Sequence, residues 1–179
     1  MTSGQGLAEI LLDQGLLEIG DYEFNDGTLA TGKLNWDNIE EGTEGFEESA
    51  SQIADIVTQY KCDLIVPIPR GANTLGQLVA AKAGLGCVLL EAPDRRTLKA
   101  TERAAMEILK HERIALVDDI TRTGGTLQRG TSLIPNVAVC TGVWDRSDSG
   151  IYFIRGFNRE DIPVEAVIRR PVSLDGVIL

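Results

Sequence analysis

Short apolar runs alternate with stretches of helical periodicity, and this alternation restricts the possible folds more than any other feature. The expected strands are residues 63–68, 87–90, 114–117 and 137–143. Apolar residues recur every three or four positions in the segments beside them. The expected helices are residues 44–60, 73–83, 97–111 and 125–132. Buried strands separated by helices indicate an α/β fold, with a mostly parallel central sheet and helices on both faces.

The chain before residue 44 has a different pattern. Residues 7–20 have helical spacing and predict a short first helix, whereas residues 21–38, with Asn25-Asp26-Gly27, predict a hairpin and loop. Asn73 is expected to cap the helix that it begins. Because 179 residues without an internal repeat or linker suit one ordinary domain, we expect a single domain.

The charge balance restricts the partners. The chain has 27 acidic residues against 17 Lys and Arg, a formal net charge of -10, and no strong basic block. Such a chain repels nucleic acids and anionic membranes, so we expect neither as a partner. The cysteines, Cys62, Cys87 and Cys140, are far apart and odd in number, which indicates buried thiols in a reducing cytoplasm. The sequence has neither a secretory pattern at its start nor an apolar run near the roughly 18 residues of a membrane span.

The segment 114–127, IALVDDITRTGGTL, predicts a ligand site. Asp118 and Asp119 stand at the carboxyl end of an expected strand, where ligands bind in open α/β sheets. Gly124 and Gly125 allow backbone N–H groups to turn inward at the start of a helix, and Arg122 adds a positive charge, so the loop suits a phosphate. The alternative is an ordinary turn that Asp119 and Thr121 only cap and that the glycines close.

Residues 116–126, with Ile114 and Ala115 before them, resemble the phosphoribosyl pyrophosphate (PRPP) motif of type I phosphoribosyltransferases, in which four apolar residues, an acidic pair and a glycine-threonine loop follow in that order. The resemblance implies that Asp118 and Asp119 bind the ribose hydroxyls and favour positive charge developing at the anomeric carbon. It also implies a loop for the 5′-phosphate, made of Arg122, Thr123, Gly124, Gly125 and Thr126. Mg²⁺ would be carried by PRPP, without a direct protein ligand.

Residues 66–72, VPIPRGA, are similar to the pyrophosphate loop of that family, which implies pyrophosphate contacts from Pro69, Arg70 and Gly71. The family often has a non-proline cis peptide in this loop, and the resemblance predicts one at Pro69–Arg70. Residues 71–76 also have the outer spacing of a Walker loop. However, Gln77-Leu78 stands where Lys and Ser or Thr are required, which disfavours an NTPase.

Both ends of the chain are similar to orotate phosphoribosyltransferases. Residues 28–33 (TLATGK) resemble a segment of their hood near the base, and residues 143–146 (VWDR) resemble their Val-Asp-Arg after a late strand. This makes Lys33 and Arg146 candidate base or substrate contacts, with a solvated charge or an internal ion pair as the alternative. The resemblance implies a core of about 44–144, hood elements at about 1–40 and 145–179, and a homodimer.

One segment departs from the orotate enzymes, which carry a mobile loop with lysines and a His-Gly pair. Residues 89–113 contain no His-Gly pair and are expected to be largely helical, with His111 at the helix end and no catalytic role. The basic residues of this segment either replace the missing cations or, as we favour, decorate a solvated helix. They include Arg95, Arg96, Lys99 and Arg103.

The leading hypothesis is transfer of a phosphoribosyl group from Mg-PRPP to a nitrogen of a nucleobase, with release of pyrophosphate. Orotate is the first acceptor to consider and a purine base the second. The rival hypothesis, motivated by the missing lysine-histidine loop, is a regulatory protein of the same fold that binds PRPP without catalysis.

Overall fold

The computed structural model describes residues 4–23, 29–35, 43–94, 97–146 and 150–169. Its main sheet has six strands in the order β4-β3-β5-β6-β8-β7, of which all neighbours are parallel except β7 and β8. These strands are β3 (Leu64–Pro67), β4 (Gly86–Cys87), β5 (Ile114–Thr121), β6 (Val137–Asp145), β7 (Phe153–Arg155) and β8 (Asp161–Ile168). The predicted α/β fold with a mostly parallel sheet is therefore confirmed.

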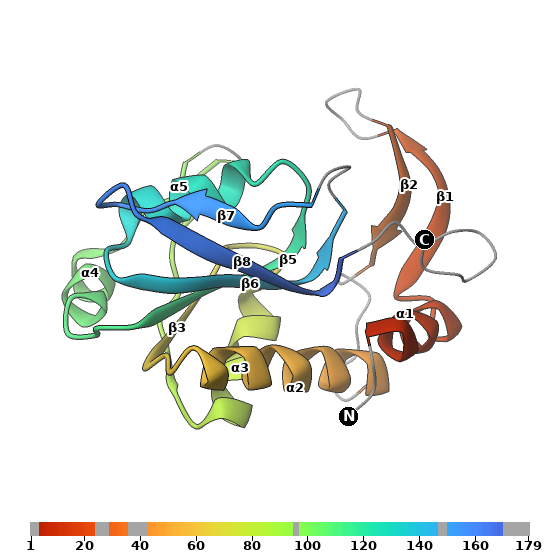
Figure 1. Cartoon of the computed structure of the whole chain (residues 1–179), viewed down its shortest axis with the longest axis horizontal. Coiled ribbons are helices and arrows are strands. Elements are labelled where there is room, and N and C mark those ends of the chain that lie inside the picture. Colours follow the sequence, from red (N-terminus) through yellow and green to blue (C-terminus); the bar gives the residue numbers. More distant parts are fainter. Residues whose placement is uncertain (1–3, 24–28, 36–42, 95–96, 147–149, 170–179) are drawn as a thin grey trace.

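Helices cover both faces of this sheet (Figure 1). They are α1 (Gly4–Asp13), α2 (Glu44–Gln59), α3 (Asn73–Ala83), α4 (Glu102–Ile108) and α5 (Gly125–Leu133). Alternate residues of β5 pack on opposite faces of the sheet, because successive side chains of a strand point in opposite directions. Val117 packs in the core that includes α1, α2 and α3, whereas Leu116 packs in the core that includes α4 and α5. None of the helices in the described parts of the chain has the length and apolar character needed to cross a membrane.

The first helix is shorter than predicted. It ends at Asp13, because Gly15 has a φ of 67° and the amide of Leu16 donates to the carbonyl of Leu11 at 2.8 Å. Strand β1 (Leu17–Glu23) then pairs with β2 (Leu29–Leu34). The hairpin expected within residues 21–38 is present but begins earlier, and Asn25-Asp26-Gly27 lies outside the described residues.

The predicted helix over residues 97–111 is also wrong in its first part. Glu91 and Lys99 form an antiparallel bridge, with amide-to-carbonyl distances of 2.8 and 2.9 Å. Helix α4 begins only at Glu102, after Thr101 accepts a hydrogen bond from the amide of Ala104 at 3.1 Å. We call residues 91–94 and 97–99 the bridge segment. Of the basic residues in this part, Lys99 and Arg103 are exposed, while Arg95 and Arg96 lie outside the described residues.

Other differences are smaller. The strand expected over residues 87–90 covers only Gly86–Cys87. Helix α3 begins at Asn73 as predicted, but Ala72 is its N-cap and no side chain caps it. Cys62 and Cys140 are buried as expected, Cys87 is half-buried, and all three thiols are free.

The C-terminal segment extends the main sheet. Strand β8 pairs with β6, with Cys140 opposite Val164, and β7 pairs with β8. Ile162 and Val164 are 2 % exposed because they join the core under α5. Residues 153–168, which we expected to belong to the hood, thus pair with the main sheet, whereas β1 and β2 form a separate two-stranded sheet.

Helix α3 packs so closely on β3 that Gly76 leaves no room for a side chain. A Cβ there would lie 2.5 Å from Cβ of Pro67. Alanine is a better helix former than glycine by roughly 1 kcal/mol, but overpacking should outweigh this gain. We therefore expect Gly76→Ala to lower the free energy of unfolding by about 1–3 kcal/mol. Denaturant unfolding measures this, with Gly86→Ala as a control because its new Cβ would lie 3.4 Å from Leu64. Equal stability of the two variants would contradict the close packing.

Candidate functional site

The acidic pair lies in the second half of β5, near its carboxyl end. Asp118 is 6 % exposed and pairs in register with Gly142 of β6, while Asp119 is half-buried. The amide of Asp119 donates to Oδ1 of Asp118 at 3.0 Å, and the amide of Ile120 donates to Oδ1 of Asp119 at 2.7 Å. Burial, followed by the negative charge of Asp119, raises the pKa of Asp118 well above its ordinary value. A cation or a hydroxyl donor would relieve this unfavourable pair.

Residues 121–127, which we call the phosphate loop, follow the acidic pair. With Asp118 and Ile120 they line a hollow of about 110 Å³. Gly124, at a φ of 70°, is the N-cap of α5, and the nine-residue helix starts at Gly125. The hollow therefore meets the positive end of a helix dipole and the hydroxyls of Thr123 and Thr126, as an anion site requires.

Residues 68–71, which we call the proline-arginine loop, lie directly against the acidic pair. A Cβ on Gly71 would be 2.2 Å from Oδ2 of Asp119, so only glycine allows this approach. The described residues contain no cis peptide bond, and the predicted cis bond at Pro69–Arg70 is wrong. Instead, Arg70 has a φ of 83° with a trans bond, which turns the chain before Gly71 without cis geometry.

A larger cavity of about 380 Å³ joins the two loops. It shares Asp118, Ile120 and Thr126 with the small hollow, so the two spaces form one bipartite site. Its other lining residues come from the proline-arginine loop, the bridge segment, strand β5 and helix α5. They are Ile68, Pro69, Arg70, Gly71, Ala92, Asp94, Leu98, Asp119 and Arg129. The structure therefore brings together the predicted acidic pair and residues of both predicted phosphate-binding loops.

Arg129 and the bridge segment were not predicted as parts of the site. Arg129 lies three residues after Thr126 on α5, and its Nη2 donates to Oγ1 of Thr126 at 3.1 Å. Its positive charge lowers the pKa of Asp118, against the effect of burial. Helical spacing from Thr126 is the signal that would have found it. Arg70 connects the bridge segment to the site, because its Nη2 donates to the carbonyl of Ala92 at 3.2 Å.

Lys33 lies in the hairpin. Its Nζ is 3.1 Å from Oε2 of Glu18 and 5.0 Å from the ring centre of Tyr22. Lys33 is not among the residues that line the two hollows. This internal ion pair is the alternative that the sequence left open for it.

Arg146 lies where the hairpin meets the end of β6. Its Nη1 donates to the carbonyl of Gly32 at 2.8 Å, and its amide donates to the carbonyl of Thr121 at 2.9 Å. Burial and the nearby charge of Arg122 lower the pKa of Arg146, while Asp119 opposes this shift. Arg146 is therefore coupled electrostatically to the acidic pair and to the phosphate loop.

The acidic pair can give a metal ion some oxygen ligands but not a complete set. The described residues contain no group of three or more His, Cys, Asp or Glu able to hold a metal. Both carboxylate oxygens of Asp94, the third acid of the cavity, accept from Thr97, each at 2.8 Å. Mg²⁺ prefers six oxygen ligands and commonly takes several from substrate phosphates and water. Asp118 and Asp119 fit such an ion as partners, but not as a complete cage.

Comparison with known proteins agrees with this geometry. Residues 35–143 match the phosphoribosyl transferase domain family. The chain is 25 % identical over 126 residues to an orotate phosphoribosyltransferase of Sulfurisphaera tokodaii, covering 69 % of this chain and 63 % of the relative. It is 28 % identical over 131 residues to that of Saccharolobus solfataricus, covering 72 % and 65 %. The chain thus spans just under two thirds of the length of these relatives.

Solved structures show the same fold. Orotate phosphoribosyltransferase from Aeropyrum pernix has a TM-score of 0.68 at 15 % identity, covering 91 % of this chain and 93 % of that one. Adenine phosphoribosyltransferase from Thermoanaerobacter pseudethanolicus has a TM-score of 0.61 at 17 % identity, covering 91 % and 99 %. Because the neighbours act on different bases, the fold does not identify the acceptor.

Proposed function

The chain belongs to the phosphoribosyl transferase domain family, and from this we propose that it transfers a 5-phosphoribosyl group from Mg-PRPP to a nitrogen of a nucleobase. In this reaction the bond between C1′ and the pyrophosphate oxygen breaks, a C1′–N bond forms, and pyrophosphate leaves. The observation that carries the proposal is the bipartite site, in which Gly71 holds the proline-arginine loop against Asp119.

We assign the sugar to the acidic pair. Carboxylates accept hydrogen bonds from a diol, so Asp118 and Asp119 suit the ribose hydroxyls. The charge that develops on the ribose ring during displacement is positive, and preorganised carboxylates beside it stabilise the transition state. Ligand binding also offsets the electrostatic cost of burying Asp118, because hydroxyl protons or a cation then face its carboxylate.

We assign the phosphates to the two ends of the site. The small hollow, with Thr123, Gly124, Gly125 and Thr126, suits the 5′-phosphate. The proline-arginine loop suits the pyrophosphate, and Arg129 is placed to contact a phosphate oxygen where the two spaces meet. Mg²⁺, when bound to the pyrophosphate, would neutralise the charge of the leaving group next to Asp118 and Asp119.

For the acceptor we propose a nucleobase, with orotate, which is anionic, ahead of a purine. Arg122 and Arg146 act on each other through their charges, and two cations held close together favour a ligand that carries a carboxylate. Two curated relatives are named orotate phosphoribosyltransferases, which supports the same order. Lys33 stays a candidate contact that would have to leave Glu18 first. From the resemblance we also propose a cytoplasmic homodimer, which light scattering would test.

The deciding experiment has two steps. Titration calorimetry with PRPP and Mg²⁺ tests the donor site, and pyrophosphate release with orotate, uracil, adenine and hypoxanthine tests transfer. Release with orotate supports the full proposal, and release only with a purine would replace the acceptor. PRPP binding without release on any base would favour the non-catalytic sensor, whereas the absence of PRPP binding would refute both functions.

A further inference from the structure

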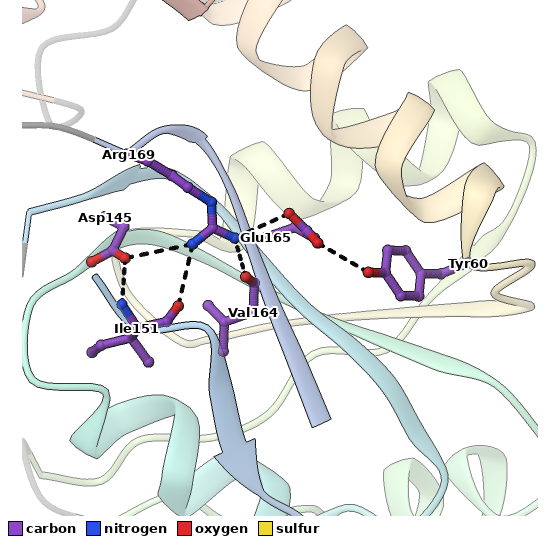
Figure 2. A network of polar contacts seen from close by, with 6 residues as sticks. All are labelled: Tyr60, Asp145, Ile151, Val164, Glu165 and Arg169. Carbon is purple, nitrogen blue, oxygen red and sulfur yellow. Dashed lines mark hydrogen bonds and ion pairs between the residues drawn. The ribbon is translucent and has the colours of Figure 1, made fainter. Parts of the chain in front are cut away.

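Arg169, directly after β8, is the centre of a network of polar contacts (Figure 2). Its Nη1 lies 3.9 Å from Oδ2 of Asp145 and donates to the carbonyl of Ile151 at 3.4 Å. Its Nη2 donates to the carbonyl of Val164 and to Oε2 of Glu165, the latter at 3.0 Å. One planar guanidinium thus holds acceptors from three segments, which the single ammonium of a lysine would do less well.

Asp145, the last residue of β6, makes this network more than a surface ion pair. Its side chain is 0 % exposed, and its Oδ2 accepts from the amide of Ile151 at 2.8 Å. A buried carboxylate is stable only with hydrogen bonds and a nearby cation, and Ile151 and Arg169 supply these. The network therefore ties together two points of the chain on either side of residues 147–149.

Both tied points reach the proposed site. Asp145 precedes Arg146, whose amide and guanidinium bond to Thr121 and to the hairpin, respectively. At the other point, Cδ1 of Ile151 would lie 3.2 Å from a Cβ on Gly124, so the side chain of Ile151 packs under the N-cap of α5. Arg169 lines neither hollow, yet only Ile151 separates it from Gly124 of the small hollow, and only Asp145 separates it from Arg146.

We propose that Arg169 is a positioning residue for the phosphoribosyl site. Through Asp145 and Ile151 it sets the placement of Arg146 and of the phosphate loop at Gly124. Small displacements of such groups weaken ligand binding and reaction, because the loop must present its N–H groups and hydroxyls to one phosphate at once. This inference rests on the proposed function, since it assumes that the phosphate loop binds a phosphate.

Two other side chains provide controls, one at the edge of the network and one outside it. The hydroxyl of Tyr60 at the end of α2 donates to Oε1 of Glu165 at 3.0 Å, on the far side of the network from the site. Tyr60→Phe removes this contact and leaves those of Asp145 and Ile151. Arg155 on β7 is an exposed arginine, 3.8 Å from Asp161, with no contact to Asp145 or Ile151 among those described. Arg155→Met is therefore the second control, because it makes the same substitution at another arginine close to β8 without touching Asp145 or Ile151.

The test compares Arg169→Met and Arg169→Lys with these controls. Calorimetry with ribose 5-phosphate, and with PRPP plus Mg²⁺, measures binding well below the melting temperature of each variant. We expect Arg169→Met to weaken ribose 5-phosphate binding about tenfold, the size of effect known for residues that act through a packed network. Arg169→Lys should show a smaller loss, and both controls should bind as the parent chain does.

Hydrogen exchange provides a readout that does not depend on binding. The amides of Ile151 and residues 124–126 should exchange faster in Arg169→Met than in Arg155→Met, while the amides of α2 and α3 stay unchanged. Unaltered binding, or faster exchange spread evenly over the chain, would overturn the positioning role. If Arg169→Met does not fold, Arg169→Lys decides by the same criteria. Failure of the parent chain to bind either ligand would refute the proposed function, and exchange would still decide on the positioning role.

Discussion

Asp118→Asn is expected to lower the rate of phosphoribosyl transfer by about 100-fold or more and, at neutral pH, to make the unliganded protein more stable. Removing one preorganised electrostatic group commonly lowers kcat about 100-fold or more, and Asp118 is the more deeply buried acid of the pair. The gain in stability has a separate cause, since the variant no longer buries an ionisable carboxyl group next to the negative charge of Asp119.

The sign of the pH dependence follows from the raised pKa of Asp118. The folded protein holds this proton at pH values where the unfolded chain, with an ordinary pKa of 3.8, has released it. The free energy of unfolding therefore falls as pH rises from about this value through the folded pKa. Asp118→Asn removes this decline, with a gain at pH 7 of about 1–3 kcal/mol, or several degrees in melting temperature for a domain of this size.

Thermal unfolding from pH 4 to 8, together with pyrophosphate release, measures both effects. Asp161→Asn is a suitable control, because Asp161 is an exposed acid at the start of β8, away from the site. It should change neither turnover nor the pH profile. A lower melting temperature of Asp118→Asn at pH 7, or full turnover, would contradict the role given to this carboxylate.

Gly71→Ala is expected to lower kcat/KM about 100-fold, the loss typical of a displacement of about 1 Å at reacting groups. Its Cβ would lie 2.2 Å from Oδ2 and 2.7 Å from Cγ of Asp119, so either the carboxylate or the proline-arginine loop must move. Because Gly71 is exposed, this displacement should cost little stability.

Steady-state kinetics measure the loss, and Gly86→Ala, with ordinary contact distances at its new Cβ, is the control. The double variant with Asp119→Ala tests the cause, since residues in direct contact are not additive. Once the side chain of Asp119 is absent, the alanine at 71 should have little further effect. Independent, multiplying losses would show that Gly71 acts on something other than Asp119.

Local patterns predicted the central part of the fold and of the site. The strand, loop and helix over residues 114–133 were predictable because apolar residues, glycines and helical spacing follow one another without interruption. The predictions that failed depend on pairing between separate segments, which local patterns do not show. The bridge of Glu91 with Lys99 replaces part of a predicted helix, and the pairing of β8 with β6 places a supposed hood segment in the main sheet.

The same distinction holds within the site. The sequence singled out Asp118, Asp119 and both loops as candidates, and the structure brings them together. It did not predict the contact of Gly71 with Asp119, which depends on how two strand ends meet. Arg129 was missed because it follows the recognised motif on a helix, where its side chain could equally be solvated. Lys33 matched a motif, yet cross-strand pairing placed it opposite Glu18.

The contact between Trp144 and the hairpin makes the site observable by fluorescence. Trp144 is 3 % exposed, its indole would be 3.1 Å from a Cβ on Gly32, and its ring lies 5.9 Å from the guanidinium carbon of Arg146. The chain has two tryptophans, so a Trp36→Phe variant would carry a single emitter. The emission wavelength of Trp144 would then report whether water enters between the hairpin and the main sheet. Ligands that contact Arg146 could be titrated by the change in this fluorescence.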